Sequence, residues 1–286
     1  MGFADWFKKK FGKQPCAFCG AEVGMLKRTK IKNGDFICNE CSRSCSRYID
    51  KYRYTKEELL GHMEYMKQQE KLYASLGEPS RVIPGSGSRE AIEFYDQAGM
   101  FRIRDLDTDN RYPKDMIRYD QVAEYKPFCH ESEPEEEGKP KVFDECGVTI
   151  TLVGSDTDVT ELPKGLRPHP YITRELEVVV NKDDKKIGMM DVDYIIRHFN
   201  TIFGVYDDTK GLFSFGPTTQ QKREGEALKA MGGMFAAAIK VAKAGGEVAQ
   251  ETMEQVQDAM NKVEDAATCG LAQYSRLADE AEAKIQ

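Results

Sequence analysis

The chain has 286 residues, of which 40% are hydrophobic and 31% are charged, and its formal net charge is −7. This length and composition fit one to three globular domains. No run approaches the roughly 18 apolar residues of a membrane-spanning helix, and residues 1–13 lack the apolar core of a signal peptide. The sequence therefore argues against a membrane-spanning or secreted protein.

Charge is distributed unevenly along the chain. Residues 1–54 carry twelve Lys and Arg against five Asp and Glu, whereas residues 55–217 carry 21 against 32. Residues 218–286 carry 8 against 11. A basic N-terminal part thus precedes an acidic body. Its basic surface could contact an anionic partner or the acidic part of its own chain.

Residues 1–13 are predicted to form a short amphipathic helix. Four aromatic residues share one face at helical spacing, and four lysines cover the rest: Phe3, Trp6, Phe7 and Phe11, with Lys8, Lys9, Lys10 and Lys13. We expect the aromatic face to pack on the module that follows, which is too small for a core of its own. The alternative is that the helix lies on an anionic membrane or a partner.

The clearest motif is a pair of Cys-x-x-Cys turns separated by eighteen residues. Cys16 and Cys19 form the first turn, and Cys38 and Cys41 form the second. Each turn can place two thiolates on one side of a tight loop, and two turns can close a tetrahedron around one Zn²⁺. Four sulfur ligands leave no open position for water, so the predicted zinc site is structural rather than catalytic.

Residues 15–48 are interpreted as a zinc ribbon. Asn33-Gly34 predicts a hairpin turn between strands at 25–31 and 36–38, and a short helix is expected from 41 to about 52. Cys45 lies four residues after Cys41 and is interpreted as a small residue near the site. Basic residues interleave with tyrosines along the module, a composition that could contact nucleic acid. They are Lys27, Arg28, Lys30, Lys32, Arg43, Arg47, Lys51 and Arg53, with Tyr48, Tyr52 and Tyr54.

The next segment is predicted to be a helix that ends in a linker. Thr55 and Glu58 have the spacing of a capping box. Leu59, Met63, Met66 and Tyr73 then recur on one stripe. Gly77, Pro79, Pro84 and the sequence GSGS at 85–88 are expected to end the helix and form a Gly/Pro/Ser linker to residue 97.

From about residue 91 to 205 the pattern becomes mostly β. Expected strands are 100–104, 116–125, a short one at 142–143, 147–153 and 175–180. The acidic run at 131–137 is expected to be a solvated loop. Residues 191–203 are predicted to form an amphipathic closing helix. Antiparallel strands closed by one helix fit a small α+β unit.

Residues 206–286 are predicted to form a helical tail. One helix is expected from Thr218 or Thr219 to about 243 and a second after Gly245-Gly246. This tail could be a helical hairpin on the domain or a self-association surface. The sequence leaves both readings open.

No catalytic motif is evident. The four histidines, His62, His130, His169 and His198, lie neither in a metalloprotease motif nor beside a nucleophile in sequence. There is no P-loop and no Gly-x-Ser-x-Gly elbow. We therefore expect no catalytic or cofactor-binding residues, no small-molecule substrate and no enzyme activity.

The N-terminus resembles a bacterial zinc-ribbon family of unknown function. The resemblance rests on Met1-Gly2-Phe3, Cys16-Ala-Phe-Cys19-Gly20, the basic stretch 27–32, Asn33-Gly34 and Cys38-Asn-Glu-Cys41. It implies that the ribbon is often followed by a β-rich domain similar to a bacterial pleckstrin-homology (PH) module. Residues 98–205 are compatible with such a domain. The family supplies no activity or ligand.

These observations predict an α+β protein of four parts. They are an amphipathic segment plus zinc ribbon (1–54), a helix and linker (55–97), a PH-like domain (98–205) and a helical tail (206–286). The Cys-x-x-Cys pairs favour a reducing, cytoplasmic compartment, in which Cys45, Cys129, Cys146 and Cys269 are thiols. We expect a non-enzymatic interaction or scaffold protein that binds a protein partner or itself. The alternatives are a peripheral membrane adaptor acting through residues 1–13 and, less favoured, nucleic-acid binding through the basic ribbon.

Overall fold

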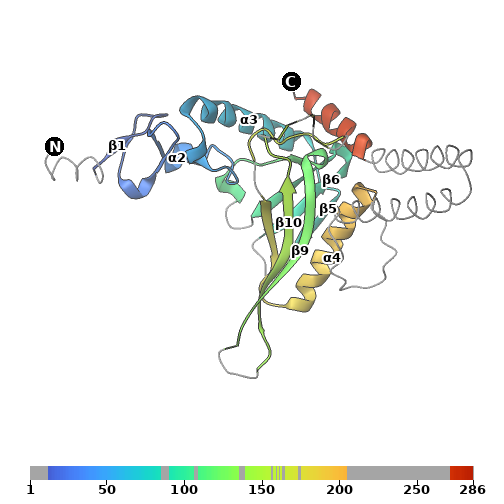
Figure 1. Ribbon diagram of the computed structural model, residues 1–286. Helices are drawn as coiled ribbons and strands as arrows, with labels where there is room; N and C mark the ends of the chain where they lie inside the picture. The colour runs from blue at the N-terminus through green and yellow to red at the C-terminus, as the bar shows by residue number, and fades with distance from the viewer. Residues whose placement is uncertain are drawn as a thin grey trace, which may run out of the picture.

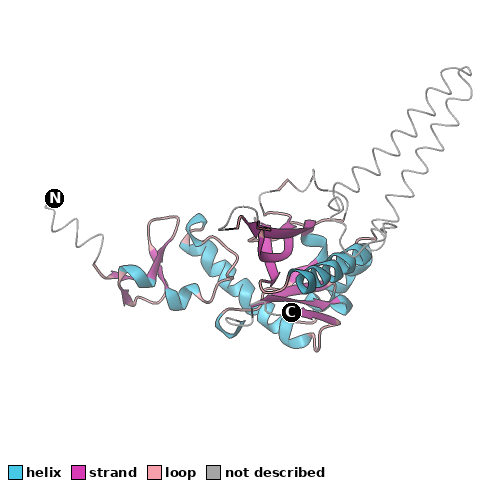
Figure 2. Cartoon of the chain, turned by 90° about the horizontal axis from the view of Figure 1, so that it is seen from below, coloured by secondary structure: helices cyan, strands magenta, loops and turns pink. Residues whose placement is uncertain are grey.

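The structure is a computed structural model. It describes residues 12–84, 90–105, 109–134, 139–155, 157–158, 160, 162, 165–172, 175–204 and 271–285. The helix expected at 1–13 lies almost entirely outside the described residues, and the tail helices expected between 218 and 270 lie outside them as well. In Figures 1 and 2 the N-terminal module stands at one end of the molecule, and the larger sheets with their covering helices form the body.

The N-terminal module contains two small antiparallel hairpins. Strand β1 pairs with β2, and β3 pairs with β4. Their bounds are β1 Gln14–Pro15, β2 Glu22–Val23, β3 Arg28–Lys30 and β4 Phe36–Cys38. The predicted Asn33-Gly34 turn is confirmed, since Gly34 has φ +89° and its N–H donates to the Ile31 carbonyl at 2.9 Å. Glycine adopts this left-handed backbone without the steric cost that a Cβ would impose.

The helix expected from 41 to about 52 is wrong. The structure has only a single helical turn, α2 (Asn39–Ser42), and a 3-10 turn at Lys51–Arg53. Between them the chain turns toward the body, where Ser46 contacts the buried Asp115 and Arg47 contacts the half-buried Glu90 and Asp105. A continuous helix would have carried these two residues past those partners.

Helix α3 (Lys56–Ser75) begins as predicted. The Glu58 N–H donates to Thr55 Oγ1 at 3.3 Å, and the Thr55 N–H donates to Glu58 Oε2 at 2.6 Å, which confirms the capping box. The buried face is broader than the apolar stripe suggested, because two polar side chains lie on it. Its buried residues are Leu59, His62, Met66, Gln69 and Leu72.

Two antiparallel sheets form the body (Figure 1). The first has the order β5-β6-β7-β8, and the second has the order β11-β10-β9. The strands of the first are β5 Arg81–Pro84, β6 Glu90–Tyr95, β7 Met100–Asp105 and β8 Ile117–Arg118. The strands of the second are β9 Val122–Ser132, β10 Val142–Leu152 and β11 Glu175–Asn181.

Several strand predictions needed correction. The stretch expected to be linker contains all of β5 and β6, which pair from Arg81 opposite Phe94 to Pro84 opposite Ala91. The region expected as one strand at 116–125 is divided by a 3-10 turn at Tyr119–Gln121. The strands expected at 142–143 and 147–153 are one strand, β10. The acidic run expected as a loop begins in a strand, because Glu131 and Ser132 belong to β9, and its residues 135–137 lie outside the described residues.

Helix α4 (Lys185–Ile202) covers the sheets and closes the core (Figure 1). It begins six residues earlier than position 191, where the sequence predicted its start. Asp184 caps it, and the Ile187 N–H donates to the Asp184 carboxylate at 3.0 Å. Phe199 lies at the centre of an aromatic cluster, with ring centroids 5.3 Å from Phe101 and 5.0 Å from Tyr125. None of the helices within the described residues is both long and apolar enough to cross a membrane.

The N-terminal module and the body share one hydrophobic core. Ile31, Ile37 and Ile49 of the module belong to the same buried cluster as Leu59 of α3 and Val178 of β11. All five side chains are at most 6% exposed. The module is therefore packed into the body rather than tethered to it.

A short helix at residues 271–283 packs on the body beside α3 (Figure 1). Arg118 of β8 is the main contact, since its guanidinium donates to Asp279 at 2.8 Å and to Glu282 at 2.9 Å. The same guanidinium pairs with the fully buried Asp120 at 2.9 Å. Ala278 and Ala281 join a second apolar cluster on the body. This part of the expected tail thus contacts its own chain.

Gly99 provides a test of how the 271–283 helix is docked. It has φ +61°, and a Cβ at this position would lie 2.1 Å from the Tyr274 carbonyl oxygen. Gly77 has a similar φ of +71° but nothing within 4 Å. We expect Gly77→Ala to cost about 1 kcal/mol of unfolding free energy from the backbone strain alone. Gly99→Ala should cost about 2 kcal/mol more and should make the C-terminal helix sensitive to protease.

Urea unfolding and limited proteolysis of the two variants measure these effects. Equal losses of stability in the two variants, with an equally protected C-terminus, would contradict the docking.

Because two histidines are buried, we expect the folded protein to lose stability against unfolding in mild acid. Burial lowers the pKa of His62 to about 4 and that of His169 to about 3. The unfolded chain therefore binds protons below pH 6.5 that the folded chain does not, so stability is present above this pH and is lost as the pH falls. Each histidine should cost about 1 kcal/mol between pH 7 and 5.5.

Chemical denaturation of His62→Gln across this range tests the prediction, because Gln can accept the Ser46 N–H without titrating. We expect a shallower pH slope than in the parent protein. A pH slope for His62→Gln equal to that of the parent protein would contradict the role of His62.

Candidate metal centre

The four predicted cysteines come together in the structure. Their Sγ atoms all lie within 4.8 Å of one another, and those of Cys19 and Cys38 are 3.8 Å apart. Cys16 and Cys19 lie in the turn between β1 and β2, whereas Cys38 ends β4 and Cys41 lies in α2. Sulfur atoms this close can all be ligands of a single metal ion.

Local hydrogen bonds shape each Cys-x-x-Cys turn. In the first turn, the Gly20 N–H donates to the Cys16 carbonyl at 2.9 Å, with Gly20 at φ +74°. In the second, the Cys41 N–H donates to Cys38 Sγ at 3.4 Å, so that this sulfur caps α2. The Ala17 N–H donates to the Phe36 carbonyl at 2.8 Å and joins the two halves. The backbone thus holds the sulfur atoms together.

The electrostatics of the cluster favour thiolate at one sulfur and a thiol at another. Burial raises the pKa of Cys16, but backbone N–H groups, including that of Cys38 at 3.3 Å, outweigh it and lower the pKa to about 6. Burial and hydrogen bonds to the other sulfur atoms raise the pKa of Cys41. A divalent cation would reverse this second effect, because its charge stabilises every thiolate around it.

Cys45 is not part of the cluster. Its side chain is fully buried in the core with Ile31 and Ile37, and burial raises its pKa to about 11. Its place in the core, outside the cluster, agrees with its interpretation as a small residue rather than a ligand. Within the described residues, the four cysteines are the one group of His, Cys, Asp and Glu side chains close enough together to hold a metal ion.

The junction between the module and the body contains residues that sequence reasoning missed. The Ser46 N–H donates to His62 Nε2 at 3.0 Å, and the Ser46 hydroxyl donates to Asp115 at 2.9 Å. Burial raises the pKa of Asp115 to about 7, although the Ser46 hydroxyl lowers it. The polar position of His62 on the buried face of α3 was the only signal in the sequence.

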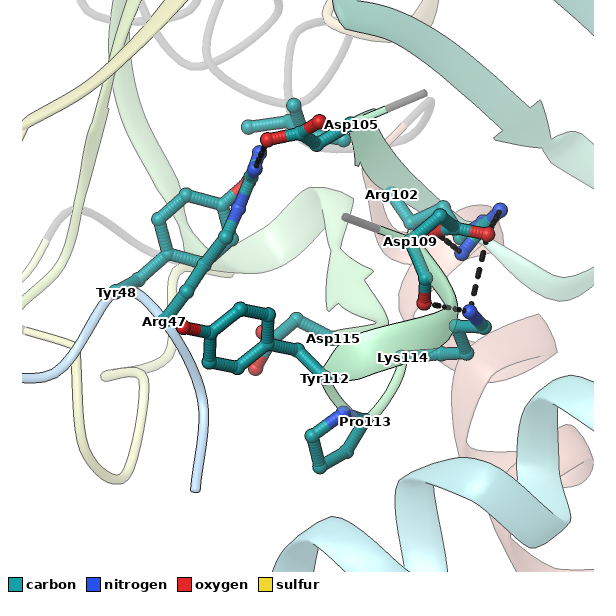
Figure 3. Close-up of a pocket in the computed structure, with 10 residues that line it drawn as sticks. Arg47, Tyr48, Arg102, Asp105, Asp109, Tyr112, Pro113, Lys114 and Asp115 are labelled. Carbon is teal, nitrogen blue, oxygen red and sulfur yellow. Dashed lines mark hydrogen bonds and ion pairs between the residues drawn. The ribbon is translucent and has the colours of Figure 1, made fainter. Parts of the chain in front are cut away.

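Two of the basic residues predicted to form an open surface contact their own chain at this junction. Arg47 pairs with Asp105 at 2.7 Å and with Glu90 at 3.0 Å, and Lys51 donates to the Ser46 carbonyl at 3.2 Å. Figure 3 shows Arg47 extended past Tyr48 toward Asp105. The hollow in that view has a volume of about 20 Å³, enough for a single water molecule and too small for a ligand.

The histidines predicted to have no catalytic role lie in separate surroundings. His62 and His169 are buried near Tyr171, whereas His130 is exposed on β9 beside Glu145. His198 of α4 lies 3.0 Å from Asp96. None of them joins the cysteine cluster.

Comparison with known proteins supports the N-terminal resemblance in part. A family model described as a domain of unknown function (DUF4428) matches residues 14–62. The matched segment contains the four cysteines and reaches His62, so it includes the Ser46–His62 contact. No curated protein and no solved structure matches the chain.

Replacing one ligand tests the metal centre. We expect Cys38→Ser to lose stoichiometric metal, because structural metal sites of this type contribute about 10–16 kcal/mol and one of four thiolates is removed. The module, residues 12–54, should become sensitive to protease. Cys45→Ala, a matched control outside the cluster, should keep its metal and lose about 1 kcal/mol of stability.

Elemental analysis of the purified proteins, together with protease mapping, provides the measurement. Stoichiometric metal and native protease resistance in Cys38→Ser would show that this sulfur is not a required ligand.

Proposed function

We propose that the chain is a non-enzymatic interaction or scaffold protein with a structural Zn²⁺ bound by Cys16, Cys19, Cys38 and Cys41. The observation that best supports the zinc site is the cluster of four sulfur atoms. A tetrahedral site with Zn–S bonds of about 2.3 Å has sulfur atoms about 3.8 Å apart. Cys19 and Cys38 are 3.8 Å apart, so this pair already has the required spacing.

A structural role follows from the composition of the site. Four thiolates complete the coordination of Zn²⁺ and leave no position at which a substrate or an activated water could bind. The ion would contribute folding energy to a module too small to be stable without it. Its effect on the body would pass through the shared core and through the contacts of Ser46 and Arg47.

The order of strands supports a PH-like body. Four strands form one meander, three form a second, and α4 closes the core after the last strand. The resemblance implies a β-rich domain closed by a helix, and these two sheets with α4 are compatible with it. We infer that the PH-like domain begins at β5, near residue 81, rather than at residue 98, and ends with α4.

An exposed apolar site on the ribbon supports partner binding. Leu26 is 90% exposed and Met25 is 45% exposed, both in the short turn before β3. Leu26 is more exposed than any other large hydrophobic residue of the described chain. It lies next to Lys27 on a module whose other side is packed into the body. We infer that this turn contacts an acidic protein partner.

The alternatives have less support. A membrane adaptor would combine Leu26 and Lys27 with residues 1–13, which lie almost entirely outside the described residues. Nucleic-acid binding is weakened because Arg47 and Lys51 contact their own chain. Self-association through 218–284 would have to spare the 271–283 helix, which contacts the body. A reducing, cytoplasmic compartment remains our inference from the thiols.

A matched pair of substitutions tests the partner site. Leu26→Ser removes the exposed apolar side chain of the ribbon, and Leu60→Ser removes one that is 48% exposed on α3. Neither side chain is part of the core, so both variants should fold. Losing a buried leucine at an interface costs about 2 kcal/mol. We therefore expect a roughly tenfold or larger loss of the captured partner for Leu26→Ser and little change for Leu60→Ser.

In-cell crosslinking and affinity capture, with identification by mass spectrometry, provide the measurement. Equal recovery of every partner by both variants would contradict the ribbon site. Loss of anionic vesicle binding by Leu26→Ser, without loss of a protein partner, would favour the membrane alternative.

A further inference from the structure

Two cysteines that the metal centre does not use lie directly opposite each other in the second sheet. The register of β9 and β10 pairs Cys129 with Cys146, flanked by His130 opposite Glu145 and Phe128 opposite Gly147. Opposed residues on antiparallel strands point to the same face, with Cα atoms about 4.5 or 5.5 Å apart. Disulfide bonds span Cα separations of about 4.4–6.8 Å, so either spacing fits.

The two thiols lie beneath the first turns of α4. A Cβ on Gly188 would approach Cys146 Sγ to 2.4 Å, which shows that this sulfur lies against the helix. Lys185, in the first turn, pairs with Glu131 at 2.6 Å, two residues beyond Cys129 on the same strand. The thiols are therefore held between a sheet and a helix that the core keeps in place.

The two sulfur atoms differ in access to solvent. Cys146 is fully buried, whereas Cys129 is only half-buried. A small oxidant can therefore reach Cys129, and the cysteine best placed to react with the oxidised product is its neighbour. Redox-sensitive cysteines are often accessible and placed next to a second cysteine that resolves the oxidised sulfur. Burial raises the pKa of the Cys129 thiol, which slows its attack on an oxidant, so the pair is assigned from its geometry.

We propose that Cys129 and Cys146 form a reversible disulfide when the protein meets a hydroperoxide. The Cys129 thiolate attacks one peroxide oxygen, the O–O bond breaks, and Cys129 becomes a sulfenic acid while the leaving oxygen takes a proton. The Cys146 sulfur then attacks the Cys129 sulfur and displaces hydroxide, which leaves as water with the Cys146 proton. Two thiols lose two electrons, and hydrogen peroxide is reduced to two waters.

The other described cysteines are not expected to form a disulfide in this way. Cys16, Cys19, Cys38 and Cys41 are within reach of one another, but a bound metal would hold them as thiolate ligands. Cys45 is fully buried in the core and is not part of that cluster. The Cys129–Cys146 disulfide would link β9 to β10 covalently, and Cys146 lies close to Gly188 of α4.

Peptide mapping of the full, metal-loaded chain tests the proposal. The protein is treated with hydrogen peroxide, free thiols are alkylated, and the protein is digested with trypsin without a reductant. Trypsin cleaves after Lys141, which lies between the two cysteines. Only a disulfide can then keep the Cys129 and Cys146 peptides together. We expect the linked pair to be the main disulfide product and to separate after dithiothreitol.

Two variants make the result specific. Cys129→Ser should abolish the linked pair and leave Cys146 alkylated, and this change at a half-buried position should not prevent folding. Cys45→Ala is the matched control and should form the linked pair at the parent rate.

Irreversible oxidation of Cys129 to a sulfinic acid, or full alkylation of both cysteines after peroxide treatment, would overturn the proposal. A linked pair that persists after dithiothreitol would overturn its reversibility.

Discussion

The junction at Ser46 and Arg47 is the contact on which the arrangement of this molecule depends. Arg47 places one guanidinium between Glu90 and Asp105, which come from neighbouring strands of the first sheet, while Ser46 contacts α3 and Asp115. Burial raises the pKa of Glu90 even though Arg47 lowers it, so desolvation outweighs the attraction at that carboxylate. Losing one partner would leave half-buried charges unpaired, which costs more than never burying them. The main effect of the junction is therefore to fix how the ribbon docks on the body, and its contribution to the free energy of unfolding is smaller.

A chain of dependence links the cysteine cluster to this junction. The four sulfur atoms hold the two halves of the ribbon together, and Cys38 caps α2. The segment after α2 then places Ser46 and Arg47 against the body. The shared core then connects the ribbon to α3 and the sheets. A similar set of ion pairs lies elsewhere on the body, where Arg118 contacts Asp279 and Glu282 of the 271–283 helix. In both places an arginine of one element, half-buried at Arg47 and buried at Arg118, pairs with carboxylates of another.

Local features of the sequence predicted local structure well. The cysteine spacing, the Asn33-Gly34 turn and the Thr55–Glu58 capping box each depend on a few adjacent residues, and the structure contains all three. The failures involve contacts between distant segments. The sequence could not show that Ser46 would meet His62 and Asp115, since such a pairing depends on the completed fold. The pairing of β5 with β6 was missed for a related reason: Pro84 and the GSGS sequence dominate the local pattern, whereas the strand is defined by its partner.

The central claim is that the metal-bound ribbon and the β-rich body fold as one unit through the Ser46–Arg47 junction. Hydrogen exchange of the full chain, measured by mass spectrometry before and after removal of the metal by a chelator, tests it most directly. The account predicts that protection is lost in the ribbon, at Ser46 and in the first half of α3, and that it weakens in β6 and β7. Loss confined to residues 12–43, with unchanged protection of Ser46 and α3, would contradict it.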